Sequence, residues 1–388
     1  MGRWTGPWMR RPSFWWVAMP KRAEALWRRI LGDEPGPAWL GALRAGATVA
    51  SGLYGAGVWL NNTAFELGFK PSRCLHVPVI GVGNLAVGGT GKTPLTMAVV
   101  RALQELGLPA GVISRGYGRQ GKQPLLVSDG ERILANVDQA GDEPLLLARR
   151  LGVPVAVGAS RYQAGLLLLK RCGARVLVGD DLLQHRALYR DLNLVALDAA
   201  DPLAGECLLP RGRLREGPGA LKRANAVVLT RVRDAAQARR AQESLAWRLG
   251  NKPVFACRYV LEGLEDAKGR ALEDESWQGE PVYAFCGLAR PESFRQSLRQ
   301  AGLTVLGLES FGDHHRFTID ELAGLWGRAQ TLSARALVCS GKDAVRLPAG
   351  LPGDIPVWST RLALEFLEGP RALPRLLGHA LAGWRGAA

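Results

Sequence analysis

The stretch GVGNLAVGGTGKTP, residues 81–94, decides the fold of this chain. A short apolar segment, Val77–Val82, leads into it, and an apolar-periodic segment, Pro94–Leu106, follows it. A strand, a glycine-rich turn and a helix are therefore expected in that order. Glycines let successive backbone N–H groups point at phosphate oxygens, and the start of the helix adds the positive end of its dipole. The stretch predicts a phosphate-binding loop, with a ligand-free glycine turn as the alternative.

The end of this loop has the side chains that nucleotide chemistry needs. Lys92 is expected to reach the β- and γ-phosphates, and the Thr93 hydroxyl to bind Mg²⁺. The usual pattern G-x-x-x-x-G-K-[ST] has glycine where this chain has Ala86, so the later glycines are expected to supply the flexibility. The predicted nucleotide-binding residues are Asn84, Ala86, Val87, Gly88, Gly89, Thr90, Gly91, Lys92 and Thr93.

Beyond the loop, short apolar runs alternate with helical stretches, which is typical of βαβ units around a parallel sheet. Further strands are predicted near residues 110–113, 154–157, 176–178, 194–197 and 226–229, and helices near 144–151 and 161–171. The pattern predicts an α/β fold with a P-loop NTPase-like, doubly wound parallel sheet.

Acidic residues follow the predicted strand at 176–178. Asp180 and Asp181 would lie at the carboxyl edge of the sheet, where ligands bind in such folds. Either carboxylate is a candidate to bind or orient Mg²⁺, and a helix N-cap is the alternative for each.

Two more polar segments are candidates for the site. Asp142 precedes an apolar helix, so it is either a helix cap or a carboxylate that accepts a proton from an attacking hydroxyl. Arg115 and Arg119 lie on a glycine-containing loop after the strand at 110–113. They are expected either to hold a substrate phosphate or to belong to a plain connector.

Length and composition limit the remaining possibilities. The chain has 388 residues, enough for two or three domains at about 150 residues each. A 47% hydrophobic and 22% charged composition excludes a disordered chain and a polytopic membrane protein.

The net charge of +15 favours an anionic partner. Six dispersed cysteines without a CxxC pair argue against a zinc ribbon or a disulfide framework and favour a reducing cytoplasm.

The first 60 residues are basic and rich in tryptophan. Residues 1–30 contain seven basic and one acidic side chain, and seven of the 12 tryptophans precede residue 61. This composition predicts interfacial helices on an anionic membrane surface. Residues 38–60 are mostly apolar, but five glycines and Arg44 weaken a membrane span, so spanning and lying on the bilayer both stay open. Met19 is an alternative start, and prolines interrupt any signal peptide.

Four segments are expected along the chain. Residues 1–73 form the membrane-interfacial helices, 74–250 the nucleotide-binding domain, 251–280 a β-hairpin-like linker and 281–388 a second, smaller α/β domain with a C-terminal helix. Within the linker, residues 253–269 are expected to be a strand, a turn and a second strand. The smaller domain has predicted strands near 282–286, 304–308 and 336–339 and helices near 291–300 and 319–330.

Seven motifs in one order resemble a known family. They are GVGNLAVGGTGKTP, SRGYGR, GDEP, DDLLQH, LLPRGRLRE, FGDHHRFT and KDAV, and the resemblance covers roughly residues 20–365. Together they are similar to the tetraacyldisaccharide 4′-kinases of Gram-negative bacteria. The resemblance implies transfer of the γ-phosphate of ATP to the 4′-hydroxyl of a tetraacylated glucosamine disaccharide 1-phosphate in lipid A biosynthesis. It implies ATP and Mg²⁺ as cofactors and the cytoplasmic face of the inner membrane as location. Nucleic acid is not expected as a partner, because the basic residues cluster with tryptophan near the beginning and no nucleic-acid motif appears, and the sequence indicates no protein partner.

The resemblance also implies roles for particular residues. Asp142 would be the general base, paired with His314, and His315 is the rival for that pairing. Lys92 would stabilise the transferred phosphoryl group. Substrate contacts are expected from Arg115, Arg119 and Glu216.

The chain departs from the family pattern at two notable positions. Leu182 stands where the family has glycine, which predicts a narrower metal site, and Gly341 stands where it has glutamate. The alternative function is a membrane-attached P-loop ATPase that acts as a switch on a protein partner. Its discriminator is ATP turnover without phosphorylation of a lipid.

Overall fold

A computed structural model describes residues 26–27, 29–31, 37–267, 269–273, 276–348, 350–351, 353–382 and 384. The basic, tryptophan-rich residues 1–25 therefore lie outside the described residues, together with the part of the membrane-surface prediction that depends on them.

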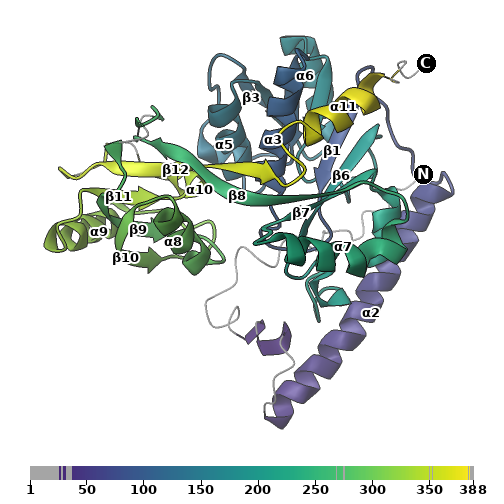
Figure 1. The fold of residues 1–388 in the computed structure, drawn as a ribbon. Coiled ribbons are helices and arrows are strands. Elements are labelled where there is room, and N and C mark those ends of the chain that lie inside the picture. Colours follow the sequence, from purple (N-terminus) through teal and green to yellow (C-terminus); the bar gives the residue numbers. More distant parts are fainter. Residues whose placement is uncertain are drawn as a thin grey trace.

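A sheet of 12 strands runs through the molecule in the order β10-β9-β11-β12-β8-β7-β6-β1-β5-β2-β4-β3 (Figure 1). Neighbouring strands are parallel except in the pairs β12–β8 and β3–β4. The strands on the nucleotide-binding side are β1 (Val79–Gly83), β2 (Ala110–Ser114), β3 (Leu125–Asp129), β4 (Pro154–Val157), β5 (Val176–Gly179), β6 (Leu192–Asp198) and β7 (Ala226–Thr230). The others are β8 (Val254–Glu265), β9 (Pro281–Cys286), β10 (Thr304–Ser310), β11 (Ala336–Cys339) and β12 (Val357–Phe366).

Helices cover both faces of this sheet, so each half is an α/β layer structure (Figure 1). We call residues 79–249 the first lobe and residues 281–351 the second lobe. The first lobe contains α3 (Lys92–Glu105), α4 (Val137–Ala140), α5 (Asp142–Leu151), α6 (Arg161–Cys172), α7 (Ala235–Leu249) and the 3₁₀ turns η3 (Ala204–Glu206) and η4 (Pro218–Arg223). The second lobe contains α8 (Pro291–Gln300), α9 (Ile319–Thr331) and α10 (Gly341–Ala344).

The core forms because β1 is buried on both faces, as a central parallel strand should be. On one face, α3 packs Leu95, Val99 and Leu103 against the apolar residues of β1 and β5. The predicted P-loop NTPase-like α/β fold with a second α/β unit is confirmed. The boundaries of the four predicted segments stay a prediction.

The connection between the lobes differs from the predicted strand-turn-strand. Residues 254–265 form one continuous strand, β8, which pairs with β7 through Val254–Ala256 and then with β12 through Cys257–Glu265. After it, an isolated bridge joins Glu265 to Ala271. The antiparallel partner of β8 is therefore β12, about 100 residues later in the chain, and not the neighbouring strand that was expected. No local pattern encodes such a pairing.

The C-terminal helix α11 (Ala372–Ala382) also departs from the prediction. Its buried Leu373 and Leu377 belong to the same core cluster as Leu95 and Val99 of α3. The helix thus packs on the first lobe (Figure 1), although the sequence assigned it to the smaller domain. An amphipathic stripe specifies that a face is buried but not against which partner.

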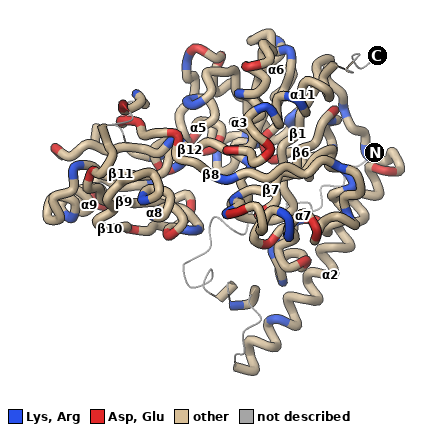
Figure 2. Tube along the Cα trace, viewed as in Figure 1, with Lys and Arg blue, Asp and Glu red and all other residues tan. Residues whose placement is uncertain are grey.

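The long helix α2 (Ala38–Glu66) lies along one edge of the molecule (Figure 1). Its inner side is tied to the segment 208–216 because Ser51 Oγ donates to the Leu208 carbonyl and Tyr54 Oη to the Arg215 carbonyl. Its outer side exposes large apolar side chains, namely Trp39, Leu43, Val49, Leu53, Trp59 and Leu60. In Figure 2 the helix shows few charged positions. None of the described helices is both long and apolar enough to cross a bilayer.

Candidate active site

The predicted phosphate loop joins β1 to α3 and curls where glycine permits it. Gly88 has φ +99° and Gly91 has φ +90°, a backbone region that residues with a side chain rarely adopt. A Cβ atom on Gly91 would lie 2.4 Å from Tyr259 Oη, so glycine is required there for space as well. Because α3 begins at Lys92, its first N–H groups have no partner within the helix and face the loop.

The first half of the predicted loop is held by the protein itself. The Val87 N–H donates to the Arg213 carbonyl at 2.8 Å, and the buried Asn84 donates from Nδ2 to the Ala86 carbonyl at 2.6 Å. Asn84 Nδ2 also contacts the Thr90 hydroxyl. These bonds shape the loop and leave residues 88–93 as the segment that curves in front of α3.

Asp181 lies beside Lys92, with Asp181 Oδ1 3.9 Å from Lys92 Nζ. The Arg215 guanidinium grips the same carboxylate with two bonds of 2.9 and 2.7 Å, and it also contacts Asn84. Loss of solvent raises the pKa of Asp181, but the charges of Arg215 and Lys92 outweigh it and hold the pKa well below its usual range. Asp181 is therefore ionised and already paired.

Asp180 has the opposite environment. Its side chain is buried, Oδ1 accepts a bond of 3.1 Å from Thr96 Oγ1, and Oδ2 has no hydrogen-bond partner among the described residues. Burial raises the pKa of Asp180 to about 7, and the charges of Glu143 and Asp181 add to the shift. No helix begins after Asp180 and Asp181, so the N-cap alternative is wrong for both.

The prediction that Leu182 narrows the metal site is wrong. Its side chain is fully buried in the core cluster that contains Val79 and Leu177. A Cβ atom on Gly179 would lie only 1.9 Å from Leu182 Cδ1, so the leucine folds back under the end of β5. The bulk of Leu182 therefore points into the core and not into the site.

Asp142 faces the second lobe. The N-cap of α5 is Gly141, so the helix-cap alternative for Asp142 is wrong. Asp142 Oδ2 lies 2.6 Å from His314 Nδ1 and 2.6 Å from Arg346 Nη2. Burial raises the pKa of Asp142, but the hydrogen bonds and charges of His314 and Arg346 outweigh it and lower the pKa to about 2. The side chain is thus an ionised carboxylate between the lobes.

His314 has the pairing that the sequence left open between two histidines. It adopts φ +62°, which is uncommon for a residue with a side chain and is found at functional sites. His315 instead binds Glu321 at 2.9 Å within the capping box of α9 and stacks on Phe311. His315 therefore helps to start a helix, while His314 reaches the first lobe.

The three predicted substrate residues have different surroundings. Arg119 binds the Gln123 carbonyl in its own loop. Burial raises the pKa of the Tyr117 phenol, and Arg115 lies near enough to offset part of that rise. Glu216 is buried between Arg223 at 2.7 Å and Asn62 of α2 at 3.0 Å. Arg115 and Arg119 lie on the loop whose Tyr117 ring is 6.0 Å from His314, and Glu216 adjoins Arg215.

Sequence reasoning missed two arginines. Arg215 stands in the quoted motif LLPRGRLRE, two residues before a stretch of glycine and proline, but nothing local indicates that it would bind Asp181. Arg346 follows the KDAV motif directly, and its contact with Asp142 spans 204 positions of the chain. Both contacts depend on tertiary structure.

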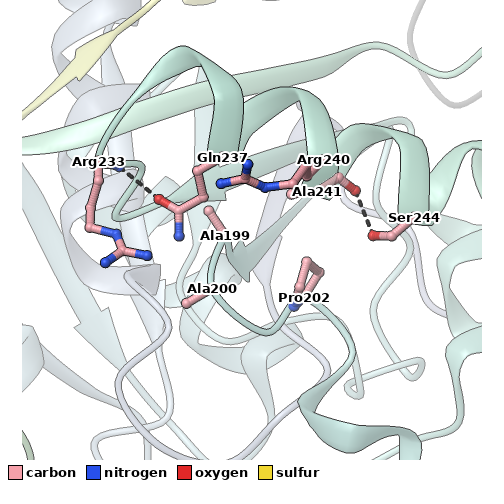
Figure 3. Close-up of a pocket in the computed structure, with 8 residues that line it drawn as sticks. All are labelled: Ala199, Ala200, Pro202, Arg233, Gln237, Arg240, Ala241 and Ser244. Atoms are coloured by element: carbon pink, nitrogen blue, oxygen red, sulfur yellow. Dashed lines mark hydrogen bonds between the residues drawn. The ribbon is translucent and has the colours of Figure 1, made fainter.

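A separate surface pocket lies between α7 and the loop after β6 (Figure 3). Its cavity volume is about 290 Å³, and it is lined by Ala199, Ala200, Pro202, Arg233, Gln237, Arg240, Ala241 and Ser244. It includes none of the predicted site residues. The predicted residues instead form two contacts elsewhere: Lys92 of the phosphate loop lies beside Asp181 after β5, and Asp142 at the start of α5 meets His314 of the second lobe.

This fold and this juxtaposition define a class, the P-loop enzymes that transfer a phosphoryl group from a nucleotide. Comparison with known proteins is more specific. A family model described as Tetraacyldisaccharide-1-P 4′-kinase matches residues 44–381, and the chain belongs to that family. The function expected from the motifs is thereby confirmed, and the ATPase switch is not favoured.

Individual relatives agree with the family match. A tetraacyldisaccharide 4′-kinase of Anaeromyxobacter sp. (strain Fw109-5) is 41% identical over 88% of this chain and 92% of its own length. One from Geobacter metallireducens is 40% identical over 86% of this chain and 97% of its own length. A crystal structure of LpxK from Aquifex aeolicus in complex with ATP is 30% identical, with a TM-score of 0.71 over 87% of this chain and 99% of that one.

Proposed function

We propose that this protein transfers the γ-phosphate of ATP to the 4′-hydroxyl of a tetraacylated glucosamine disaccharide 1-phosphate, a step of lipid A biosynthesis. The observations that support it best are the contact of Asp142 with His314 across the lobes and the position of Lys92 of the phosphate loop beside Asp181. Glu143, the neighbour of Asp142, is close enough to Asp180 to raise the pKa of that carboxyl group, so the two sites share one electrostatic environment. A donor phosphate and an acceptor hydroxyl can meet there.

For the phosphate donor, we propose that the N–H groups of residues 88–93 hold the β- and γ-phosphates. Lys92, beside this curve, would neutralise charge that develops on the transferred group. Asn84, Ala86 and Val87 would shape the loop rather than bind phosphate, because their polar groups bind other parts of the protein.

For the acceptor, we propose that Asp142 takes the proton of the attacking hydroxyl with His314 as its partner. Both side chains are mostly buried at the lobe boundary, and their 2.6 Å contact fixes the carboxylate. The transfer needs no covalent enzyme intermediate, since the hydroxyl attacks the phosphorus directly and ADP leaves. Arg115, Arg119 and Glu216 are proposed to contact the phosphorylated sugar.

The residues present fit a bound Mg²⁺. Asp180 Oδ2 is a buried carboxylate oxygen to which no described residue donates, and Thr93 lies in the first turn of α3. Among the described residues, no group of three or more His, Cys, Asp or Glu side chains could hold a metal by itself. That agrees with Mg²⁺, which commonly takes one or two protein oxygens and completes its shell with phosphate and water. We propose Asp180 and Thr93 as the residues that hold it, where it would supply neutralisation of phosphate charge.

We further propose that the enzyme works at the cytoplasmic face of the bacterial inner membrane, with α2 on anionic lipid. The outer side of α2 offers Trp39, Leu53 and Trp59 as apolar contacts. The basic residues 3–29 adjoin it in the chain and would meet lipid phosphates. A lipid-borne acceptor would then approach from the side of α2.

A labelling experiment tests the reaction. Purified protein is incubated with [γ-³²P]ATP, Mg²⁺ and tetraacyldisaccharide 1-phosphate in mixed micelles, and the lipids are separated by thin-layer chromatography. Label in a bisphosphorylated lipid is expected, and strongly reduced label with the Lys92→Ala variant. Release of inorganic phosphate without labelled lipid, stimulated by added protein, would instead support the ATPase switch.

A further inference from the structure

A second-lobe arginine shares the carboxylate that we propose as the base. Arg346 Nη2 lies 2.6 Å from Asp142 Oδ2 and 3.1 Å from His314 Nδ1, and His314 Nδ1 lies 2.6 Å from the same oxygen. The three groups form a triangle that crosses from one lobe to the other. Neither composition nor motif spacing points to this arginine.

Asp343 of the second lobe holds one end of the Arg346 guanidinium, and the other end contacts Asp142. The arginine side chain is 1% exposed, and its Nη1 lies 3.4 Å from Asp343 Oδ1. Asp343 is itself fully buried and accepts bonds from Ser340 Oγ at 2.5 Å and from the Gly287 N–H at 3.1 Å. One end of the planar guanidinium is therefore anchored, and only the other end crosses to the first lobe.

Both donors bind the same oxygen of Asp142. Among the described residues no hydrogen bond reaches Oδ1, and the side chain keeps 16% of its surface exposed. We infer that Arg346 is a positioning residue of the phosphoryl transfer, which fixes the Asp142 carboxylate so that Oδ1 is free to meet the acceptor hydroxyl. The inference rests on the proposed role of Asp142 as the base.

The charges around the triangle give this arrangement a measurable pH signature. Burial alone raises the pKa of Asp142, and the bonds from His314 and Arg346 reverse that effect. Loss of the arginine should therefore raise the pKa of the carboxyl group. The other charged or titratable groups near the triangle are Lys342, Asp313, Asp343, Glu143, Tyr117 and Arg115.

The test is the pH dependence of kcat in Arg346→Gln and Arg346→Lys. For Arg346→Gln, kcat should fall by about 10²-fold because the carboxylate loses its fixed position. The acid limb of the kcat-versus-pH profile of this variant should move to higher pH by about one to three units, since an adjacent opposite charge shifts a carboxyl pKa by that much. The KM for ATP should not change, because Arg346 makes no contact with the phosphate loop. Arg346→Lys should restore the acid limb but only part of kcat, since an ammonium cannot bind Asp142 and Asp343 as a fork.

Arg361→Gln is the matched control. Arg361 is a partly buried arginine that lies near Glu262 and Glu265 and does not touch Asp142, so its kcat and acid limb should equal those of the unmodified protein. An Arg346→Gln enzyme with an unshifted acid limb would overturn the inference. Thermal unfolding checks that each variant is folded. If Arg346→Gln does not fold, a wild-type kcat in Arg346→Lys overturns the inference that Arg346 positions Asp142.

Asp142→Asn, assayed in parallel, separates this inference from the proposed function. Full activity in Asp142→Asn would refute the role of Asp142 as the base. An inactive Asp142→Asn enzyme together with a normal Arg346→Gln enzyme would refute only the positioning role of Arg346.

Discussion

At the residue scale, the site combines neighbours of similar chemistry but different surroundings. Asp180 and Asp181 are adjacent in sequence, yet Arg215 and Lys92 neutralise Asp181, while Asp180 Oδ2 has no donor in the part of the chain that the structure describes. Likewise His314 pairs with Asp142, and His315 with Glu321 of α9. The partners that each side chain meets, rather than residue type, therefore separate the structural member of each pair from the candidate functional one.

Lys92→Ala should lower kcat by about 10²- to 10³-fold, the loss that follows when one stabilising group is removed from a developing charge. The ATP-dependent phosphorylation rate is measured at saturating lipid. Lys122→Ala, a change of an exposed lysine on a first-lobe loop, is the matched control and should leave the rate unchanged. A Lys92→Ala enzyme with the rate of this control would argue against the phosphate-loop assignment.

Asp180→Asn should raise the Mg²⁺ concentration needed for half-maximal activity, because a neutral amide replaces the unpaired carboxylate oxygen. Asp181→Asn should instead lower the melting temperature, since it leaves the buried end of Arg215 without its ion pair. Mg²⁺ titrations of activity and thermal unfolding in EDTA distinguish the two effects. If Asp181→Asn alone changes the Mg²⁺ requirement, the assignment of the metal carboxylate is reversed.

At the element scale, α2 has two different sides. Ser51, Tyr54 and Asn62 bind the segment 208–216, whose Arg215 in turn grips Asp181. The outer side leaves Leu53 and Trp59 at 74% and 64% exposure. A helix anchored on one side by polar bonds and apolar on the other suits an interface with lipid.

Leu53→Glu combined with Trp59→Glu should weaken binding to anionic vesicles by about tenfold or more, since each buried large apolar side chain contributes about 1.5–3 kcal/mol. Co-sedimentation with phosphatidylglycerol-containing vesicles measures it. Leu134→Glu, which alters an exposed leucine on the first lobe, is the control. Equal vesicle binding by all three proteins would contradict a lipid contact through α2.

At the scale of the whole molecule, the lobes meet through ion pairs in which the acidic side chain belongs to the first lobe and the basic one to the second. The first lobe supplies Asp138, Asp142 and Asp198, and the second lobe supplies Arg316, Arg346 and Arg290 as their partners. Attraction between lobes of this kind favours a closed arrangement, which excludes water from the phosphoryl donor. It also makes closure sensitive to salt.

Arg290→Gln combined with Arg316→Gln should loosen this closure without touching Asp142 or the phosphate loop. The closed population should fall by about tenfold at most, because partly exposed ion pairs are individually weak. Small-angle scattering should show a larger radius of gyration, and kcat should fall, both more strongly at low salt. Arg258→Gln combined with Arg270→Gln, which breaks exposed pairs with Glu365 and Asp266, is the control. An unchanged radius and rate would mean that these two pairs do not hold the lobes.

The sequence alone determined the local features. Residues 81–94 predicted the strand, loop and helix because glycine spacing, Lys92 and Thr93 act over a few positions. Hydrophobic periodicity predicted the other first-lobe strands, apart from the edge strand β3. The ordered motifs identified the family and brought Asp142 and His314 forward as a pair.

Only the tertiary structure decided which distant groups meet. It paired β8 with β12, packed α11 on α3, turned Leu182 into the core and brought Arg215 and Arg346 to their carboxylates. Local propensity and periodicity fix what a segment becomes and which face it buries. They do not encode its partner, because long-range packing and ion pairing depend on how the whole chain closes on itself.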